Sequence, residues 1–303
     1  MGRDSGLRQP DFRDLGPPFR FPKVYVTSSC RLFSMSADWS RRKRSRAVVR
    51  EISPRFTDAI ANYFGSGPTD VEASRAAHAA YVTALRAHGI EVDVLPGLDG
   101  FPDCCFVEDT AVVVDDVVVI PNMGHPTREG EQTDVMRLLA GSLEVQRPPE
   151  GARMDGGDVI FFDDRFLIGL STRTNEAGAA FLSEICEAKG YDTMLIEIPS
   201  TTLHLTTVAS SPQPGLLVAA EGHLTPAQLQ PLVDEGVEVL WVPNEESYAA
   251  NTIGFEGDRV IISAGYPATK ALLQNAGFSV TEVDMEHIRC ADGSLTCCSV
   301  FYL

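Results

Sequence analysis

The sequence lacks an excess of positive charge. It has 25 lysines and arginines against 42 aspartates and glutamates, which gives a net charge of −17. A surface that binds the phosphates of nucleic acid needs clustered Lys and Arg, so this balance argues against a nucleic-acid partner. It also disfavours an anionic membrane surface. An acidic balance suits a cationic small substrate, although many soluble enzymes are acidic for solubility alone.

Long apolar runs are also missing. No run approaches the roughly 20 residues that a membrane helix needs, so we expect no membrane partner. No apolar segment near the N-terminus has the pattern of a secretory signal, and Asp4, Asp11 and Asp14 argue against an organelle transit peptide. These absences favour a cytoplasmic protein.

Cysteine spacings typical of zinc sites are absent too. The seven cysteines form no CxxC or CxxH pattern, so the sequence predicts no structural metal. Two pairs are adjacent in the sequence, Cys104-Cys105 and Cys297-Cys298, and they cannot both form ordinary disulfides without strain. We therefore expect free thiols in a reducing compartment.

The first part of the chain has the composition of a loosely held extension. It contains Pro17-Pro18 and Pro22, and it ends in a basic run, Arg41–Arg46. Such a run is more often a charge cluster in solvent than a nuclear signal. We expect residues 1–44 to form a flexible N-terminal extension and residues 45–303 to form a single domain.

From about Ser45 onward, one pattern recurs. Two short apolar strands flank a turn that is often acidic, a helix follows, and a third strand ends the unit. One copy predicts strands Val159–Phe162 and Arg165–Leu170, a helix Asn175–Lys189 and a strand Thr193–Ile198. Further copies begin near residues 111, 203 and 252.

The remaining copy spans both ends of the domain. Strand Ala47–Arg50, helix Asp70–His88 and strand Glu91–Leu95 lack a partner strand, which Cys298–Leu303 would supply. Units of roughly fifty residues are typical of closed repeat architectures, because none can bury its own apolar face alone. Closure also removes exposed strand edges. The sequence thus predicts an α/β ring of five ββαβ units, with an α/β domain without symmetry as the alternative.

Several cysteines and histidines are candidates for a nucleophile and its base. A reactive thiol needs a nearby base and a site for the substrate. Cys297 follows the polar loop Asp292–Thr296 at the entrance to the last strand, where reactive groups are usually displayed. His204 begins the apolar strand Leu203–Ser210, and a lone histidine there is more often structural. The residue pattern by itself leaves the role of His204 open.

Two acidic motifs each precede an apolar strand. Asp103, Glu108 and Asp109 lie in DCCFVED, and strand alternation would turn Glu108 and Asp109 to opposite faces, so that at least one points into a central cavity. Asp155 lies in Asp-Gly-Gly-Asp, in which the glycines let the backbone approach closely and the side chains converge. Ordinary turn chemistry explains the second motif equally well.

Five stretches follow one another over roughly residues 100–300: FPDCCFVEDTAVV, MDGGDV, GLSTRTNEAG, LHLTT and DGSLTCCSV. Together they resemble the dimethylarginine dimethylaminohydrolases, a branch of the guanidino-group-modifying superfamily. The resemblance implies the pentein fold, a five-bladed α/β propeller, in agreement with the repeat. It also implies a cysteine hydrolase that converts asymmetric dimethylarginine and monomethylarginine to citrulline and methylamines, and with it a part in arginine metabolism and nitric oxide regulation.

The resemblance assigns roles residue by residue. Cys297 matches the nucleophile, His204 the general acid and base, and Asp155 the acidic residue that supports the histidine. The residues matched to substrate binding are Asp103, Phe106, Glu108, Asp109, Arg128, Arg173 and Asp292. Of these, Glu108 and Asp109 are expected to face the guanidinium group, and Asp103 to lie near the α-amino group. The two arginines are expected to hold the α-carboxylate.

Two features depart from the family pattern. His-Leu-Lys is frequent in the family, whereas Thr206 stands here in place of the lysine. Arginine deiminases carry at this position an aspartate that binds an unmethylated guanidinium nitrogen, so Thr206 favours methylated substrates. The N-terminal extension has no recognised counterpart, and the lid over the site is expected near Phe56–Ala61.

The implied chemistry needs no cofactor, and we expect Zn²⁺ only as an inhibitor that captures Cys297 and His204. We expect a monomer or a homodimer. An arginine deiminase is the nearest alternative, against which Thr206 argues. A non-catalytic thiol redox or binding protein is the alternative from another class, but it leaves Arg128, Arg173 and the Asp155 motif unexplained.

Overall fold

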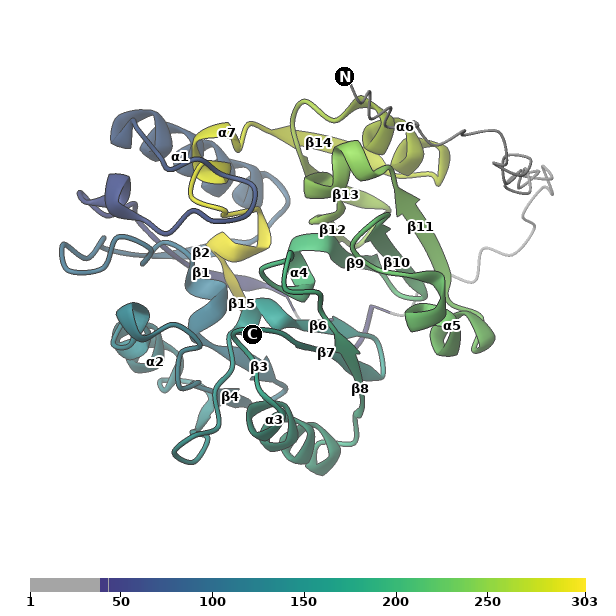
Figure 1. Cartoon of the computed structure of the whole chain (residues 1–303), viewed down its shortest axis with the longest axis horizontal. Coiled ribbons are helices and arrows are strands. Elements are labelled where there is room, and N and C mark those ends of the chain that lie inside the picture. Colours follow the sequence, from purple (N-terminus) through teal and green to yellow (C-terminus); the bar gives the residue numbers. More distant parts are fainter. Residues whose placement is uncertain (1–38, 43) are drawn as a thin grey trace, which may run out of the picture. The chain divides into compact units, whose positions relative to one another are not determined.

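The computed structural model describes residues 39–42 and 44–303. Within this part, fifteen strands form five three-stranded sheets that follow one another around a ring (Figure 1). The strands are β1 (Arg46–Arg50), β2 (Glu91–Leu95), β3 (Val112–Val114), β4 (Val117–Val119), β5 (Glu144–Gln146), β6 (Val159–Phe162), β7 (Arg165–Leu170), β8 (Asp192–Glu197), β9 (Ala209–Gln213), β10 (Leu216–Ala220), β11 (Glu238–Val242), β12 (Ile253–Phe255), β13 (Arg259–Ser263), β14 (Ser279–Val283) and β15 (Val300–Tyr302).

Each sheet has the same internal topology, which confirms the predicted ββαβ unit. The middle strand pairs antiparallel with the strand before it and parallel with the strand after it, as in β6-β7-β8. A parallel partner requires a crossover connection, and a helix supplies it in each unit. The sheet β15-β1-β2 joins the two ends of the domain through an antiparallel β1–β15 pair, so the ring closes.

The turns inside the units explain why acidic residues recur there. Asp115, Asp163 and Asp258 adopt φ angles of 53°, 57° and 55°, and Gly215 takes the equivalent place in the fourth unit with φ 73°. Tight hairpins require this left-handed backbone, which Asp and Gly tolerate better than most residues. The positions of these residues in the sequence therefore mark the turns of the hairpins.

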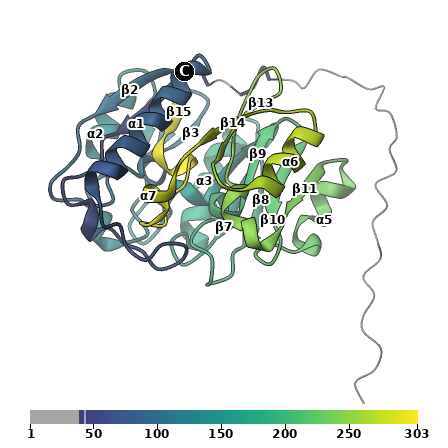
Figure 2. The same cartoon turned by 90° about the horizontal axis from the view of Figure 1, so that it is seen from above.

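The crossover helices α1, α2, α3, α5 and α6 lie on the outside of the ring, whereas α4 lies inside it, and Figure 2 shows α2 and α5 on opposite sides of the molecule. The helices are α1 (Val71–Ala87), α2 (Gln132–Leu139), α3 (Glu176–Ala188), α4 (Leu205–Val208), α5 (Pro226–Asp234), α6 (Pro267–Asn275) and α7 (Glu286–Arg289). Three of the crossover helices begin at a side-chain cap, in which Asp70, Asn175 or Thr225 accepts a backbone N–H of the first turn. None of the helices in the described part is both long and apolar enough to cross a membrane.

The apolar core lies between neighbouring sheets. Val48 of β1 packs in one cluster with Val118 of β4, and Val119 of β4 packs in the next with Ile168 of β7. Val49 of β1 shares a cluster with Ile261 of β13, which seals the junction between the first and last units. No sheet buries its faces alone, so the free energy of folding depends on the whole ring.

Short 3₁₀ helices at the inner ends of the units correct two local predictions. They are η1 (Phe56–Asp58), η2 (Val107–Thr110), η3 (Pro126–Arg128), η4 (Gly156–Asp158), η5 (Asn244–Ala250) and η6 (Thr296–Cys298). Glu108 and Asp109 lie on η2, so strand alternation does not separate them. His204 caps the helix α4 instead of starting a strand, and β9 begins five residues later. The sequence LHLTTVAS does not reveal the change from helix to strand, because the helix and strand residues in it are all buried and so show no periodicity.

The start of the described part also differs from the expectation. Arg42 is 6% exposed, and its guanidinium binds Asp163 on the β6–β7 turn and the carbonyl oxygen of Ser211. The interpretation of Arg41–Arg46 as a charge cluster in solvent is therefore wrong for Arg42, and packing against the ring begins before residue 45. Most of the expected extension, residues 1–38, lies outside the described residues.

Candidate active site

A small cavity lies among the inner ends of the units. Its volume is about 20 Å³, which is room for about one water molecule. Eight of the ten predicted site residues line it: Asp103, Phe106, Asp109, Arg128, Arg173, His204, Asp292 and Cys297. Asp155 lies against His204, and Glu108 lies on the far side of η2. The fold thus brings together residues as far apart in the sequence as Asp103 and Cys297.

Cys297 is the cysteine that lines this cavity. It lies on η6, three residues before the start of β15, and is 5% exposed. Its Sγ is 3.2 Å from the Ser294 hydroxyl. Burial raises the pKa of the Cys297 thiol well above its usual value, and the negative charges of Glu108 and Asp109 raise it further. The free protein therefore holds Cys297 as a neutral thiol at neutral pH.

Cys298 occupies a different environment. It is fully buried, and its thiol donates to the carbonyl oxygen of Ser294 at 3.5 Å. Burial, followed by the charge of Glu108, raises its pKa as well. Because Cys298 does not line the cavity, only the first cysteine of the vicinal pair faces the space that a substrate would occupy.

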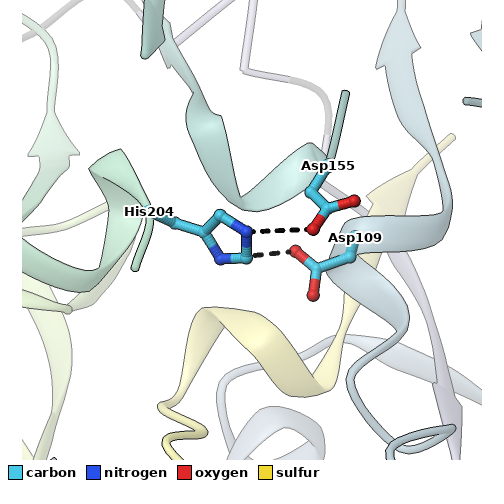
Figure 3. A group of neighbouring side chains, drawn as sticks. All are labelled: Asp109, Asp155 and His204. Carbon is cyan, nitrogen blue, oxygen red and sulfur yellow. Dashed lines mark hydrogen bonds and ion pairs between the residues drawn. The ribbon is translucent and has the colours of Figure 1, made fainter. Parts of the chain in front are cut away.

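His204 points toward two neighbouring carboxylates (Figure 3). Its Nε2 is 3.1 Å from Asp155 Oδ2, and its Nδ1 is 3.7 Å from Asp109 Oδ1. Burial would lower the pKa of the imidazole, but the charges of Asp109, Asp158 and Asp155 outweigh it and raise this pKa to about 9. His204 is therefore mainly protonated at neutral pH and can donate a proton.

The Asp-Gly-Gly-Asp motif forms the wall behind His204. A Cβ atom on Gly157 would lie 2.7 Å from both Asp109 Oδ1 and His204 Nδ1, so only glycine leaves room for this approach. Asp155 also accepts from Gly124 N at 2.7 Å and from Arg173 at 3.2 Å. Although burial acts to raise the pKa of Asp155, the hydrogen bond and charge of His204 hold it below its usual value. Asp155 therefore stays ionised and orients the imidazole.

Glu108 faces away from Asp109. Its Oε2 accepts hydrogen bonds from the Thr206 and Thr296 hydroxyls at 3.2 and 3.0 Å, and it borders a second cavity of about 90 Å³. Burial, followed by the charge of Asp109, raises the pKa of Glu108 to about 8. Glu108 and Asp109 were both expected to face the guanidinium group, but η2 turns the two side chains in different directions and only Asp109 lines the cavity beside Cys297.

Asn251 was not predicted from the sequence, yet it joins the segment that carries His204 to the segment that carries Cys297. It is fully buried, and its Nδ2 donates to Thr206 O at 2.7 Å and to Thr296 Oγ1 at 2.8 Å. Its Oδ1 accepts Thr296 N at 3.0 Å. The segments that carry His204 and Cys297 are therefore held in register by one side chain. No sequence pattern marks an asparagine 45 residues away from each partner.

The two predicted arginines are bound very differently. Arg128 forms ion pairs with Asp109 and Glu131 and also donates to Phe106 O, so at most one of its five N–H groups is left for a substrate. Arg173 makes one side-chain contact among the described residues, to Asp155. Arg173 is therefore the better placed group for a bidentate carboxylate. Glu131 was overlooked, although its i,i+3 spacing from Arg128 is a signal that could have identified it.

Asp103 and Asp292 hold a loop over the cavity. The Asp292 carboxylate accepts four consecutive backbone N–H groups, from Asn62, Tyr63, Phe64 and Gly65. Asp103 accepts from Ile60 N at 3.1 Å. Ile60 and Tyr63 of this loop line the cavity, whereas Phe56, in the expected lid, is buried in the core. Residues 59–65 therefore cover the cavity, and the cavity between them and Cys297 is too small for an arginine-sized molecule.

A cation site is also conceivable from the donor atoms alone. Asp109, Asp155 and His204 each offer a ligand atom, and these atoms lie within 4.8 Å of one another. However, Arg128 already binds Asp109 and Arg173 already binds Asp155. A metal ion here would lie next to two guanidinium charges, so the arrangement favours a protonated His204 over a bound cation.

Comparisons with known proteins agree with this geometry. A family model described as "N,N dimethylarginine dimethylhydrolase, eukaryotic" matches residues 58–301. The N(G),N(G)-dimethylarginine dimethylaminohydrolase of Pseudomonas aeruginosa is 32% identical over 238 residues, which is 77% of this chain and 90% of that protein. The enzyme of the same name from Streptomyces coelicolor is 30% identical over 257 residues, which is 84% of this chain and 96% of that protein.

Solved structures give the same answer. A structure of the Pseudomonas aeruginosa enzyme, a mutant complexed with citrulline, superposes with a TM-score of 0.78 and 29% identity. The match covers 86% of this chain and all of that one. Similarity of this extent in both sequence and fold means that the chain belongs to the dimethylarginine dimethylaminohydrolase family.

Proposed function

We propose that the protein hydrolyses N-ω-methylated arginines, asymmetric dimethylarginine and monomethylarginine, to citrulline and a methylamine. The observation that carries the proposal is the single cavity lined by the Cys297 thiol and by His204, which is protonated and supported by Asp155. A thiol and a proton donor on one cavity are what displacement of an amine from a guanidinium carbon requires. The site roles below are parts of this proposal.

Substrate binding activates the nucleophile. Burial and the charges of Glu108 and Asp109 keep the pKa of Cys297 high in the free protein, and a guanidinium cation bound in the cavity beside Asp109 offsets part of this charge. The thiol proton then leaves to solvent as the cation enters. The substrate therefore helps to generate the thiolate that attacks it.

The reaction then proceeds in two halves. The Cys297 thiolate attacks the guanidinium carbon and forms a C–S bond; the C–N bond breaks, and His204 gives its proton to the departing methylamine. This leaves a thiouronium bound to Cys297. His204 next takes a proton from water, the resulting hydroxide attacks the same carbon, the C–S bond breaks and the hydroxyl proton passes to sulfur. Citrulline leaves, and both groups regain their starting protonation.

Arg173 is proposed to bind the α-carboxylate. Arg173→Lys should raise KM for asymmetric dimethylarginine about 10- to 100-fold, with a smaller change in kcat, because lysine cannot present two parallel N–H donors. Steady-state kinetics measure this split, with Arg137→Lys on the exposed face of α2 as the control. If methylguanidine, which has no amino-acid end, reacts as well as dimethylarginine, the carboxylate contact has no role.

Substrate preference is proposed to depend on Thr206. Its hydroxyl binds Glu108, so the guanidinium end meets one carboxylate fewer than an aspartate here would provide. A carboxylate facing methyl groups would be desolvated and unpaired, at a cost of roughly 1–3 kcal/mol. We expect kcat/KM for methylated arginines to exceed that for arginine at least about tenfold, which corresponds to about 1.4 kcal/mol.

Two variants test this role of Thr206. Thr206→Asp should reduce the ratio of kcat/KM for methylated arginines to kcat/KM for arginine. It should do so by lowering kcat/KM for the methylated substrates, since it places a second carboxylate beside Glu108. Thr206→Ser keeps the hydroxyl and should leave the preference in place. Equal kcat/KM values for arginine and asymmetric dimethylarginine in the unmodified protein would instead support an arginine deiminase. If no substrate releases citrulline, the thiol redox or binding alternative gains support.

Further proposals concern the setting of the reaction. The chemistry above uses only side chains, so we propose that no cofactor is required and that Zn²⁺ inhibits by binding Cys297 and His204. We also propose a cytoplasmic enzyme, because six described cysteines are free thiols and a reducing compartment keeps them so. Removal of methylated arginines would place it in nitric oxide regulation. A monomer or a homodimer is proposed, which sedimentation would distinguish.

A further inference from the structure

Ser294 lies next to the reacting sulfur but has no role in the steps above. Its side chain is 1% exposed, and its hydroxyl is 3.2 Å from Cys297 Sγ. Within the part of the chain that the structure describes, this is the one hydrogen bond of the Ser294 hydroxyl and also the one side-chain partner of Cys297 Sγ. Both groups are held in the turn that leads through η6 into β15.

The charges around Cys297 make this contact important. Burial, Glu108 and Asp109 all oppose a negative charge on the sulfur, and the Ser294 hydroxyl is the neighbour that favours one. With a neutral thiol, either group can be the donor. With a thiolate, only the hydroxyl can donate, and hydrogen bonds to charged acceptors are about twice as strong as neutral ones. The contact therefore strengthens as the sulfur loses its proton.

We propose that Ser294 is a further catalytic residue, whose hydroxyl donates a hydrogen bond to the Cys297 sulfur and stabilises the attacking thiolate. The inference rests on the proposed function of Cys297 as the nucleophile. It requires no new covalent step: the Ser294 O–H bond stays intact, and the hydrogen bond weakens when the C–S bond forms and takes up the sulfur electron pair.

The expected size of the effect follows from two opposing contributions. Loss of a charge-assisted hydrogen bond should reduce the thiolate fraction about 10- to 100-fold. A less stabilised thiolate is more nucleophilic, so the rate constant per thiolate rises by roughly the square root of the factor by which the thiolate fraction falls. Ser294→Ala and Ser294→Gly should therefore each lower kcat/KM for asymmetric dimethylarginine about three- to tenfold. Ser294→Thr, which keeps the hydroxyl, should restore most of it.

Alkylation of Cys297 by iodoacetamide separates this role from a structural one. The rate is measured between pH 7 and 10 without substrate, in a Cys298→Ser background, with the labelled peptide followed by mass spectrometry. We expect Ser294→Ala to react about three- to tenfold more slowly below the thiol pKa and its rate profile to shift to higher pH by about one unit or more. Ser74→Ala is the matched control, because it removes a buried serine hydroxyl that donates to Asp70 O on α1.

The outcomes are distinct. Slower alkylation in the Ala and Gly variants but not in the Ser74→Ala control supports the proposal. If Ser294→Ala in the Cys298→Ser background is alkylated as fast as the Cys298→Ser parent, the proposal is overturned, even if kcat/KM falls. If the unmodified protein does not hydrolyse methylated arginines, the proposed function fails, but the alkylation comparison uses no substrate and still decides whether Ser294 stabilises the thiolate.

Discussion

Cys297→Ser is expected to abolish citrulline release from asymmetric dimethylarginine, with a fall in kcat of at least about a thousandfold. A serine hydroxyl at the same place is a far weaker nucleophile than a thiolate, and His204 is mainly protonated and so is a poor base to activate it. The measurement is colorimetric citrulline detection at saturating substrate. An unfolding temperature (Tm) equal to that of the unmodified protein would show that the variant is folded and that the loss of activity lies in the chemical step.

Cys298→Ser is the matched control for this substitution. Cys298 is fully buried and its thiol is directed to the Ser294 carbonyl oxygen, a contact that a serine hydroxyl can reproduce. Most of the activity should remain. Equal losses in the two variants would contradict the assignment of Cys297, because they would point to a shared structural role of the vicinal pair.

His204→Ala is expected to lower kcat by about 10²- to 10⁴-fold, the usual contribution of a placed acid and base. Dimethylamine is a poor leaving group without a proton, so the first half of the reaction should be affected most. S-methyl-L-thiocitrulline loses methanethiolate, which departs without protonation, so the deficit in forming the thiouronium should be much smaller with this substrate. Rapid-quench detection of the covalent intermediate measures that step.

The pH dependence of the same residue gives an independent check. The pKa of His204 lies at about 9, raised by Asp109, Asp158 and Asp155 against the effect of burial. His204 is fully protonated at low pH and loses its proton as the pH rises, so kcat/KM should decrease along the alkaline limb of its pH profile as the pH rises through about 9. Asp155→Asn removes one of the charges that raise this pKa, and the limb should move to lower pH. An unchanged alkaline limb in Asp155→Asn would contradict the assigned pairing.

The ring could be predicted because its signals are local. Strand alternation, acidic turns and helix caps depend on residues within a few positions of one another, and they located Val159–Phe162 and Arg165–Leu170 at their exact bounds. Closure followed from counting units, since a partner strand was missing at one end and available at the other. The pairing of Cys297 with His204 came in contrast from the resemblance and stays a prediction. The polar loop before Cys297 made it one candidate among seven cysteines, and no neighbour in the sequence marks His204 as a base.

The tertiary structure decided what each site residue contacts. Asp292 meets a loop 227 to 230 residues away, Asn251 joins two segments 45 residues from it, and Arg128 is neutralised by Asp109 and Glu131. Glu108 and Asp109 point in different directions, as predicted, but they do so from the 3₁₀ helix η2 and not from a strand. Glu108 contacts Thr206, and Asp109 lies next to His204. The sequence by itself determined the repeating unit, the turns and the inventory of reactive groups, since short-range backbone preferences specify them. Pairings, burial and protonation were decided only by the closed ring, because they depend on distances between side chains that are remote along the chain.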